Sequence, residues 1–239
     1  MPFVIISNKS HCLGNEKLEK CTGQIRWDGR MKRFIAATKN RGKLKEIAEI
    51  LADFPIRVVS MEEAGFDMDI EENGSSFQEN ALIKAKMVVK AAGEIVMADD
   101  SGLTVDYLDG APGIYSARFA GEGASDEDRN KKLLGLLESV PYEKRTARFI
   151  CVIAVVFPDG RYFTVNGTCE GYIGDRIAGM NGFGYDPLFY IPEYNKTIAE
   201  LDLETKNRIS HRGRALRQMA DELGNGWLDG FSINGLYGG

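Results

Sequence analysis

The chain has 239 residues, of which 44% are hydrophobic and 27% are charged. This composition is typical of a soluble globular protein, and the length suits one large domain or two lobes. The net charge of −5 argues against a protein that coats nucleic acid, because such proteins are usually strongly basic. A free nucleotide remains a possible ligand, since a few local Lys and Arg side chains can hold phosphates.

The four cysteines are far apart in the sequence and form no C-x-x-C pair, which argues against a zinc knuckle and a dithiol redox motif; they are Cys12, Cys21, Cys151 and Cys169. No apolar run approaches the roughly 20 residues of a membrane span. The apolar residues 3–6 are too few for a signal peptide. We therefore expect a cytoplasmic protein with reduced thiols and no membrane partner.

Residues 1–30 have a mixed polar composition and no clear hydrophobic period, and they end just before Met31. From Met31 the chain resembles a fresh start, with basic residues followed by a first strand. We interpret Met31 as the natural initiator and 1–30 as an upstream extension. A regulatory arm is the alternative.

From Phe34 onward, strand-like and helix-like segments alternate, which predicts an α/β fold with helices against a central sheet. Ser75 with Gln78, or Ser76 with Glu79, forms a capping box at the start of the second helix. The β-rich middle lies between helix-rich ends, which predicts a second lobe and a cleft. The expected elements are strands at 34–37, 56–59, 95–98 and 103–105, a hairpin of 147–157 and 161–170, and helices at 43–51, up to 92, 126–138 and 211–223.

The run from Ala98 to Leu103, Ala-Asp-Asp-Ser-Gly-Leu, follows an apolar stretch. Two adjacent carboxylates, Asp99 and Asp100, followed by a small hydroxyl residue and a glycine, suit a hard cation and phosphates in an exposed turn. An ordinary polar turn explains the same residues.

A basic, hydroxylated segment lies between the first strand and the first helix: Thr38, Lys39, Asn40, Arg41, Gly42 and Lys43. Free backbone N–H groups at the start of that helix, with Lys43 as a point charge, can hold a polyphosphate. The spacing is not that of a P-loop, and a solvated surface is the alternative.

Glu71 and Glu72 precede the second helix and add to the carboxylates of Asp99 and Asp100. Magnesium takes one or two carboxylates together with water and phosphate oxygens, so this supply is sufficient without histidine. Glutamates near a helix start are also expected for electrostatic reasons alone.

Two further clusters lie in the C-terminal half. In 181–187, glycines surround an aromatic pair and could present Phe183 flat against a base, while Asp186 or neighbouring backbone groups read the edge of the base. A tight corner packed on the core is the alternative. Lys206, His211 and Arg212 place three potentially cationic groups near the start of the last helix, an arrangement that suits an anion or a carbonyl.

Taken in this order, the motifs resemble the inosine triphosphate pyrophosphatases, and the resemblance covers about residues 32–223. It rests on Thr38-x-Asn40-x-x-Lys43, Phe77-x-Glu79-Asn80-Ala81 with Lys84-Ala85, the run 98–103, Gly110-Ala111-Pro112-Gly113-Ile114-Tyr115-Ser116-Ala117-Arg118, the run 182–187 and Ser210-His211-Arg212-Gly213. The match is especially close to the bacterial members, and it makes 31–239 the enzyme domain.

The resemblance implies an elongated mixed sheet with flanking helices, two lobes around a substrate cleft, Mg²⁺ as the cofactor and a homodimer. It implies that Asp100 is the catalytic base and a metal ligand, that Glu71 is a second metal-associated carboxylate, that residues 38–43 bind the triphosphate and that Ser101 contacts the substrate. It assigns base recognition to Phe183, Gly184, Tyr185, Asp186, Lys206, His211 and Arg212.

We therefore expect hydrolysis of ITP, dITP or XTP to the monophosphate and pyrophosphate by a metal-aided water. Arg212 would donate to the 6-keto group of the purine, where adenine has an amino group instead. Three alternatives remain: a pyrophosphatase for another base, a nucleotide sensor without turnover, and an RNA-binding module. The paired carboxylates argue against the sensor, and the net charge argues against the RNA-binding module.

Overall fold

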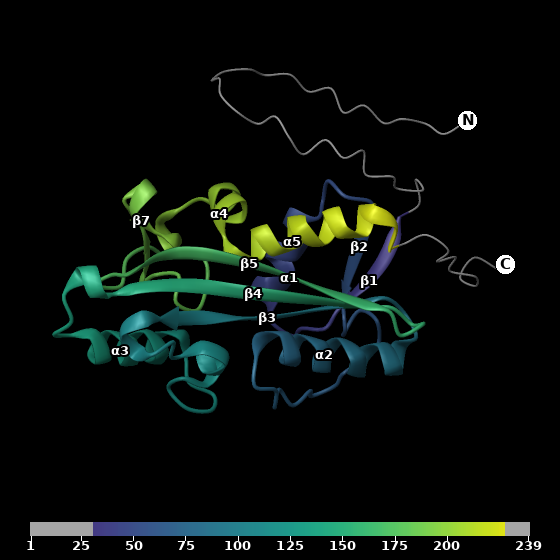
Figure 1. Ribbon diagram of the computed structural model, residues 1–239, viewed down its shortest axis with the longest axis horizontal. Coiled ribbons are helices and arrows are strands. Elements are labelled where there is room, and N and C mark those ends of the chain that lie inside the picture. Colours follow the sequence, from purple (N-terminus) through teal and green to yellow (C-terminus); the bar gives the residue numbers. More distant parts are fainter. Residues whose placement is uncertain (1–30, 228–239) are drawn as a thin grey trace, which may run out of the picture.

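A seven-stranded mixed sheet runs along the long axis of the protein in the computed structural model, which describes residues 31–227 (Figure 1). The strands are β1 (Lys32–Ala36), β2 (Ile56–Ser60), β3 (Val96–Val105), β4 (Thr146–Val156), β5 (Tyr162–Ile173), β6 (Phe189–Ile191) and β7 (Lys196–Thr197). The helices are α1 (Arg41–Ile50), α2 (Phe77–Ala92), α3 (Asp126–Leu137), α4 (Leu203–Ile209) and α5 (His211–Glu222), with a short 3-10 helix η2 (Gly113–Arg118) before α3. The expectation for residues 1–30 lies outside the described residues.

The strand order is β2-β1-β3-β4-β5-β6-β7, in which β2, β1 and β3 are parallel and the later pairs are antiparallel. The contact between β1 and β3 is short, because only Ile35 and Ala36 have partners on β3, at Val96 and Met97. The chain then leaves β1 toward α1. The middle of β3 is therefore paired with β4 on one side, while no strand within residues 31–227 pairs with it on the other. The cavity described below lies along that edge.

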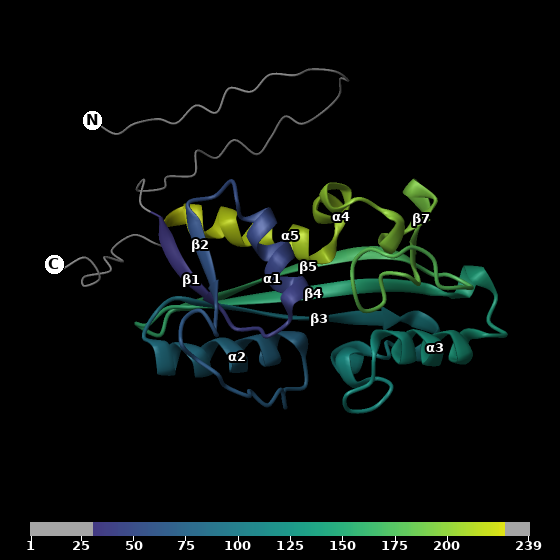
Figure 2. The same cartoon turned by 180° about the vertical axis from the view of Figure 1, so that it is seen from behind.

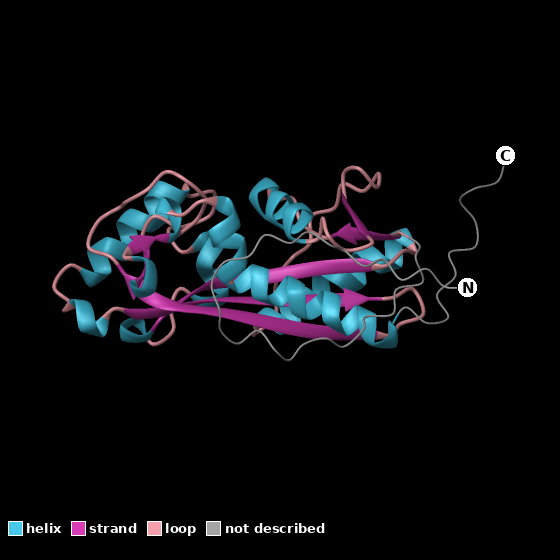
Figure 3. Ribbon diagram, turned by 90° about the horizontal axis from the view of Figure 1, so that it is seen from above, coloured by secondary structure: helices cyan, strands magenta, loops and turns pink. Residues whose placement is uncertain are grey.

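Helices cover both faces of the sheet, as expected for this fold class. Figures 1 and 2 show α1, α4 and α5 on one side and α2 and α3 on the other. One core cluster joins α1 and α5 to the sheet and includes Phe34 and Ile153, and a second joins α2 to Ile35 and Ala154. A third cluster gathers around α3 at the far end of the long strands, which run through both lobes (Figure 3).

The predicted hairpin and the predicted ends of α2 are confirmed, whereas the first helix, expected at 43–51, spans Arg41–Ile50. The Ser76 hydroxyl accepts from the backbone N–H of Glu79 at the start of α2, and Gly93 ends this helix in a left-handed conformation. The Glu79 carboxylate accepts from Ser75 instead of Ser76. Ser76 therefore caps the helix, while Ser75 binds the carboxylate of the third helical residue. Ser125 and Ser210 cap α3 and α5 as predicted.

The predicted exposed turn at the acidic run is wrong. The segments 95–98 and 103–105 belong to one continuous strand, because every residue of β3 has a partner on β4, including Asp99 opposite Ile153 and Asp100 opposite Val152. Both carboxylates are buried, with 3% and 6% of their surface exposed. Ionised groups at this depth require partners of opposite charge, and the site supplies them.

Candidate active site

A cavity of about 700 Å³ opens along the edge of β3 that has no strand partner in the described part of the chain. This volume is within the range of small-molecule sites. Its walls come from the start of α1, the middle of β3, η2, the start of α3, the turn 183–186 and the junction of α4 with α5. The predicted site residues that line it are Thr38, Asn40, Arg41, Gly42, Lys43, Asp100, Ser101, Phe183, Gly184, Tyr185, Asp186, Lys206, His211 and Arg212.

Two predicted residues, Lys39 and Glu71, do not line the cavity. The Lys39 ammonium lies 2.8 Å from an Asp67 oxygen and 2.7 Å from an Asp69 oxygen, and these ion pairs are exposed. Glu71 is exposed, whereas the next residue, Glu72, is half-buried in the cavity wall. The structure thus places Glu72, and not Glu71, near Asp100.

The start of α1 is fixed by two side-chain caps. The Asn40 carboxamide oxygen accepts from the backbone N–H of Lys43 at 3.1 Å, and the Thr38 hydroxyl accepts from the N–H of Asn40 at 3.1 Å. A Cβ atom on Gly42 would lie 2.7 Å from Cδ1 of Phe183, so a larger residue would push the aromatic ring aside. A helix start of this kind, beside the Lys43 ammonium, favours a bound anion.

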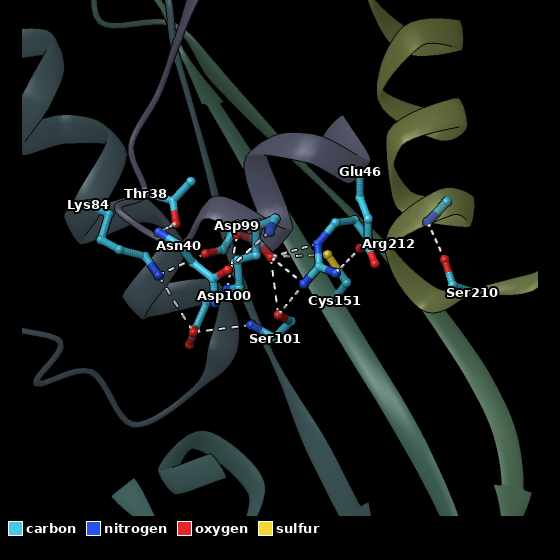
Figure 4. A network of polar contacts seen from close by, with 12 residues as sticks. Thr38, Asn40, Glu46, Lys84, Asp99, Asp100, Ser101, Cys151, Ser210 and Arg212 are labelled. Atoms are coloured by element: carbon cyan, nitrogen blue, oxygen red, sulfur yellow. Dashed lines mark hydrogen bonds and ion pairs between the residues drawn. The ribbon is translucent and has the colours of Figure 1, made fainter. Parts of the chain in front are cut away.

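Asp100 has a carboxylate oxygen that takes part in neither a hydrogen bond nor an ion pair among the described residues. Its Oδ1 accepts from the backbone N–H of Ser101 and lies 3.6 Å from Nζ of Lys84, while its Oδ2 is buried and has no hydrogen-bond partner among the described residues (Figure 4). The pKa of Asp100 is raised to about 6, mainly by burial; the charge of Glu72 contributes to the rise, and the charge of Lys84 opposes it. At neutral pH the group is thus an ionised carboxylate that is more basic than usual, as a general base requires.

A chain of buried ion pairs lies behind the cavity. The Arg212 guanidinium donates to Oε2 of Glu46 at 2.5 Å, to Oδ2 of Asp99 at 3.1 Å through Nη2, and to the hydroxyl of Ser101 at 2.9 Å (Figure 4). Lys206 lies 2.6 Å from Oε1 of Glu46 and 2.5 Å from Oδ2 of Asp186. In order, the chain is Asp186, Lys206, Glu46, Arg212, Asp99 and Lys43, with alternating charges.

Arg212 is not the free donor to the base that we expected. Four of its five N–H groups donate to Glu46, Asp99 and Ser101, and only 2% of the residue is exposed. Asp186 is similarly occupied, because its Oδ2 accepts from Lys206 and from the backbone N–H of Phe183. Both residues line the cavity, but their polar groups mainly fix their neighbours.

His211 keeps a polar atom free. The imidazole stacks on Phe149, with ring centroids 4.7 Å apart, and its Nδ1 is buried without a partner among the described residues. Burial lowers the pKa of His211 well below its ordinary value, and the charges of Arg212 and Lys206 lower it further. The ring is therefore neutral at physiological pH and can either donate or accept one hydrogen bond in the cavity.

The turn that carries Phe183 is held from α3. The backbone N–H of Gly184 donates to Oδ2 of Asp126 at 2.7 Å, and the side-chain amide of Asn130 donates to the carbonyl of Gly184 at 2.9 Å. The ring of Phe183 lies beneath the Lys206 ammonium, 4.9 Å from its centroid.

Sequence reasoning missed Glu46, Asp126 and Asn130. Glu46 lies off the apolar stripe of its helix, so the hydrophobic pattern gave no reason to place it in the site. Acidic residues such as Asp126 are common at helix starts, so its position did not indicate a functional role.

The buried cysteines take no part in this chemistry. Burial raises the pKa of Cys151 to about 12 and that of Cys169 to about 11, so both are neutral thiols. Between residues 31 and 227 no three His, Cys, Asp or Glu side chains gather in a cluster that could hold a metal by themselves. No helix in this part of the chain is long and apolar enough to cross a membrane.

Comparison with known proteins places the chain among close relatives. The model of the Ham1 family matches residues 34–222. A "dITP/XTP pyrophosphatase" of Desulforamulus reducens is 53% identical over 191 residues, which cover 80% of this chain and 95% of the relative, and one of Geobacter sulfurreducens is 53% identical over 194 residues, covering 81% and 98%. The solved Ham1 protein of Staphylococcus aureus has a TM-score of 0.73 at 44% identity, covering 81% of this chain and 99% of that one.

Proposed function

The chain belongs to the Ham1 family, and from this premise we propose that it is a magnesium-dependent pyrophosphohydrolase that removes non-canonical purine nucleotides. It hydrolyses purine nucleoside triphosphates such as ITP, dITP and XTP to the monophosphate and pyrophosphate. The observation that carries this function is the buried, unpartnered Oδ2 of Asp100 beside a helix start that suits phosphates.

The residues near Asp100 fit a magnesium ion. The unpartnered Oδ2 of Asp100 offers one ligand, and Glu72, whose charge raises the pKa of Asp100, offers a second. Magnesium needs only one or two protein carboxylates, because water and substrate phosphates supply the other ligands. Asp100 and Glu72 would hold the ion, which when bound offsets the charge that develops on the phosphate oxygens.

The attack on the phosphorus needs an aligned water and a stabilised leaving group. Asp100 orients a water molecule and accepts its proton as the water oxygen bonds to the α-phosphorus and the bond to the bridging oxygen breaks. The α1 start and the Lys43 ammonium hold the pyrophosphate that leaves, and Lys84 keeps Asp100 in place from 3.6 Å.

Phe183 and His211 are the groups that support purine recognition. The ring of Phe183 offers a face on which a base can stack. In the tautomer with a proton on Nδ1, neutral His211 donates a hydrogen bond to a 6-keto group, and the amino group of adenine in that place gives two donors facing each other. A buried donor without a partner costs about 1–3 kcal/mol, which is a discrimination of about ten- to a hundredfold.

A homodimer and a cytoplasmic location complete the proposal, and their support is the resemblance to the family. Light scattering on the eluting peak of a sizing column tests the first of them, since a mass of one chain rules out the dimer. Cell fractionation tests the second.

The decisive experiment measures pyrophosphate release from ITP, dITP, XTP, ATP and GTP, with and without magnesium. We expect turnover of the first three only, and only with the metal. Asp100→Asn should lower kcat at least about a hundredfold with an unchanged melting temperature, because the base is removed without a change in volume. Asp175→Asn, an exposed control, should leave kcat unchanged. A rate for Asp100→Asn within about threefold of the wild type would reject Asp100 as the base.

A further inference from the structure

Arg118, the last residue of η2, lies beside the catalytic part of β3. The Ser116 hydroxyl in the same short helix accepts from the backbone N–H of Leu103 at 2.9 Å. A Cβ atom on Gly102 would lie 2.5 Å from the carbonyl oxygen of Gly113, so η2 rests directly against the strand. The start of α1 reaches the same strand at Asp99 through Lys43. Asp100 and Ser101 therefore lie between α1 and η2 along β3.

The backbone around Arg118 is held on both sides by cations of α3. Arg129 donates to the carbonyl of Ala117 at 2.9 Å, and Lys132 donates to the carbonyl of Phe119 at 2.5 Å. The Arg118 side chain lines the cavity, and its guanidinium lies over the ring of Tyr115, 4.9 Å from the centroid. The backbone on both sides of Arg118 is thus held in place, and its guanidinium rests on an aromatic ring.

Most of the cationic side chains in the cavity wall are neutralised by a carboxylate, but that of Arg118 is not. Five other Lys and Arg residues of its lining have a carboxylate partner within 4 Å: Lys43, Lys84, Arg129, Lys206 and Arg212. Of the cations that line the cavity within residues 31–227, Arg41 and Arg118 form no ion pair. Arg41 opens α1 and belongs to the segment already expected to bind phosphate. Arg118 supplies the second uncompensated charge, from η2.

We propose that Arg118 binds the phosphate groups of the substrate, from the side of Asp100 and Ser101 that lies opposite α1. A guanidinium suits this task because its planar fork can donate two parallel hydrogen bonds to one phosphate. The triphosphate is then held between the α1 start and Arg118, over the carboxylate that activates the water. The nature of the substrate rests on the proposed function, but the phosphate site itself does not.

Calorimetry with inorganic pyrophosphate tests the phosphate site directly. We expect Arg118→Gln to weaken pyrophosphate binding about ten- to a hundredfold, because a charge-assisted contact is lost. Arg118→Lys, which keeps the charge and loses the fork, should lie between the wild type and Arg118→Gln. Arg176→Gln removes an arginine that is outside the cavity lining and exposed, and it should bind pyrophosphate as the wild type does.

Kinetics with ITP then separate phosphate binding from a general loss of structure. Arg118→Gln should raise KM about tenfold or more while the inhibition constant of inosine, which has no phosphate, stays within about twofold. Unchanged pyrophosphate binding in Arg118→Gln, absent binding in the wild type, or an equal loss of inosine and pyrophosphate would each overturn the role. If the wild type binds pyrophosphate but hydrolyses none of the purine nucleotides, the proposed function fails while the Arg118 site stands.

Discussion

The two walls of the cavity are held in different ways. The α5 wall, which we define by Lys206 and Arg212 with Glu46 and Asp99 directly behind them, consists of residues that are at most 3% exposed and are joined by ion pairs. The η2 wall, which comprises η2, the start of α3 and the turn at Gly184, is half-exposed and depends on single hydrogen bonds to backbone groups. The charges of the α5 wall thus compensate one another, whereas the η2 wall has polar groups that can bind a ligand.

This difference has an energetic consequence. Removing one member of a buried ion pair leaves an uncompensated charge and costs about 3–5 kcal/mol, whereas a typical hydrogen bond contributes about 0.5–1.5 kcal/mol. Substitutions in the α5 wall should therefore reduce stability first. Substitutions in the η2 wall should mainly change substrate binding. The following substitutions probe this contrast.

Glu46→Gln should give the largest loss of stability. The substitution keeps the shape but leaves Lys206 and Arg212 without their shared carboxylate, and we expect the free energy of unfolding to fall by about 3–5 kcal/mol. Urea unfolding measures it. Glu49→Gln on the exposed face of α1 is the matched control and should change stability by less than about 0.5 kcal/mol. Equal effects of the two substitutions would refute the electrostatic account of the α5 wall.

Lys43→Ala tests the end of the ion-pair chain that faces the substrate. Asp99 keeps Arg212 as a partner, so the loss of stability should be smaller than for Glu46→Gln. We expect KM for ITP to rise about ten- to a hundredfold, while the inhibition constant of inosine changes by less than about twofold, because only phosphate binding loses a charge. Lys45→Ala, an exposed change on the same helix, serves as the control. A parallel loss for inosine would remove Lys43 from the phosphate site.

His211→Gln should change how stability depends on pH. In the folded protein, burial keeps His211 neutral, whereas in the unfolded chain it binds a proton below its ordinary pKa of 6.5. Stability should thus be fully present above that pH and fall below it, with a contribution approaching about 1.4 kcal/mol per pH unit.

The comparison of wild type and variant isolates this slope. Asp100, whose pKa is raised to about 6, gains its proton earlier in the folded state and acts with the opposite sign in both proteins. Unfolding at several pH values between 6.5 and 5 is the measurement. Parallel curves for the two proteins would show that His211 is protonated in the folded state.

The sequence predicted the elements whose signals are local. Ser76 and Gly93 mark the ends of α2, and the turn at 158–160 marks the hairpin of β4 with β5, because caps and tight turns depend on neighbouring residues. The α/β class was also predicted correctly, because the alternation of strand-like and helix-like segments can be recognised along the chain.

The continuity of β3 and the partners of Arg212 were not predicted. Two adjacent aspartates indicate a turn unless distant cations compensate them, and Arg212 is 113 positions from Asp99 and 166 from Glu46. Local patterns carry no information on such pairs. The motif residues therefore indicated where the site lies, while the contacts among them required the fold.

Asn130→Ala should give the smallest effect and tests the η2 wall. The side-chain amide of Asn130 donates to the carbonyl of Gly184 at 2.9 Å, while its Oδ1 is buried and has no partner in the described part of the chain. The substitution removes one hydrogen bond together with one unsatisfied acceptor, so the free energy of unfolding should change by less than about 1 kcal/mol. The turn at Gly184 keeps its bond to Asp126 but loses its second anchor, and Phe183 is then positioned less firmly. We expect KM for ITP to rise about three- to tenfold with kcat within about twofold, and Lys131→Ala, one residue away and exposed, to change neither. A fall in kcat with an unchanged KM would mean that Asn130 supports the chemical step, and the contrast between the two walls would then be wrong.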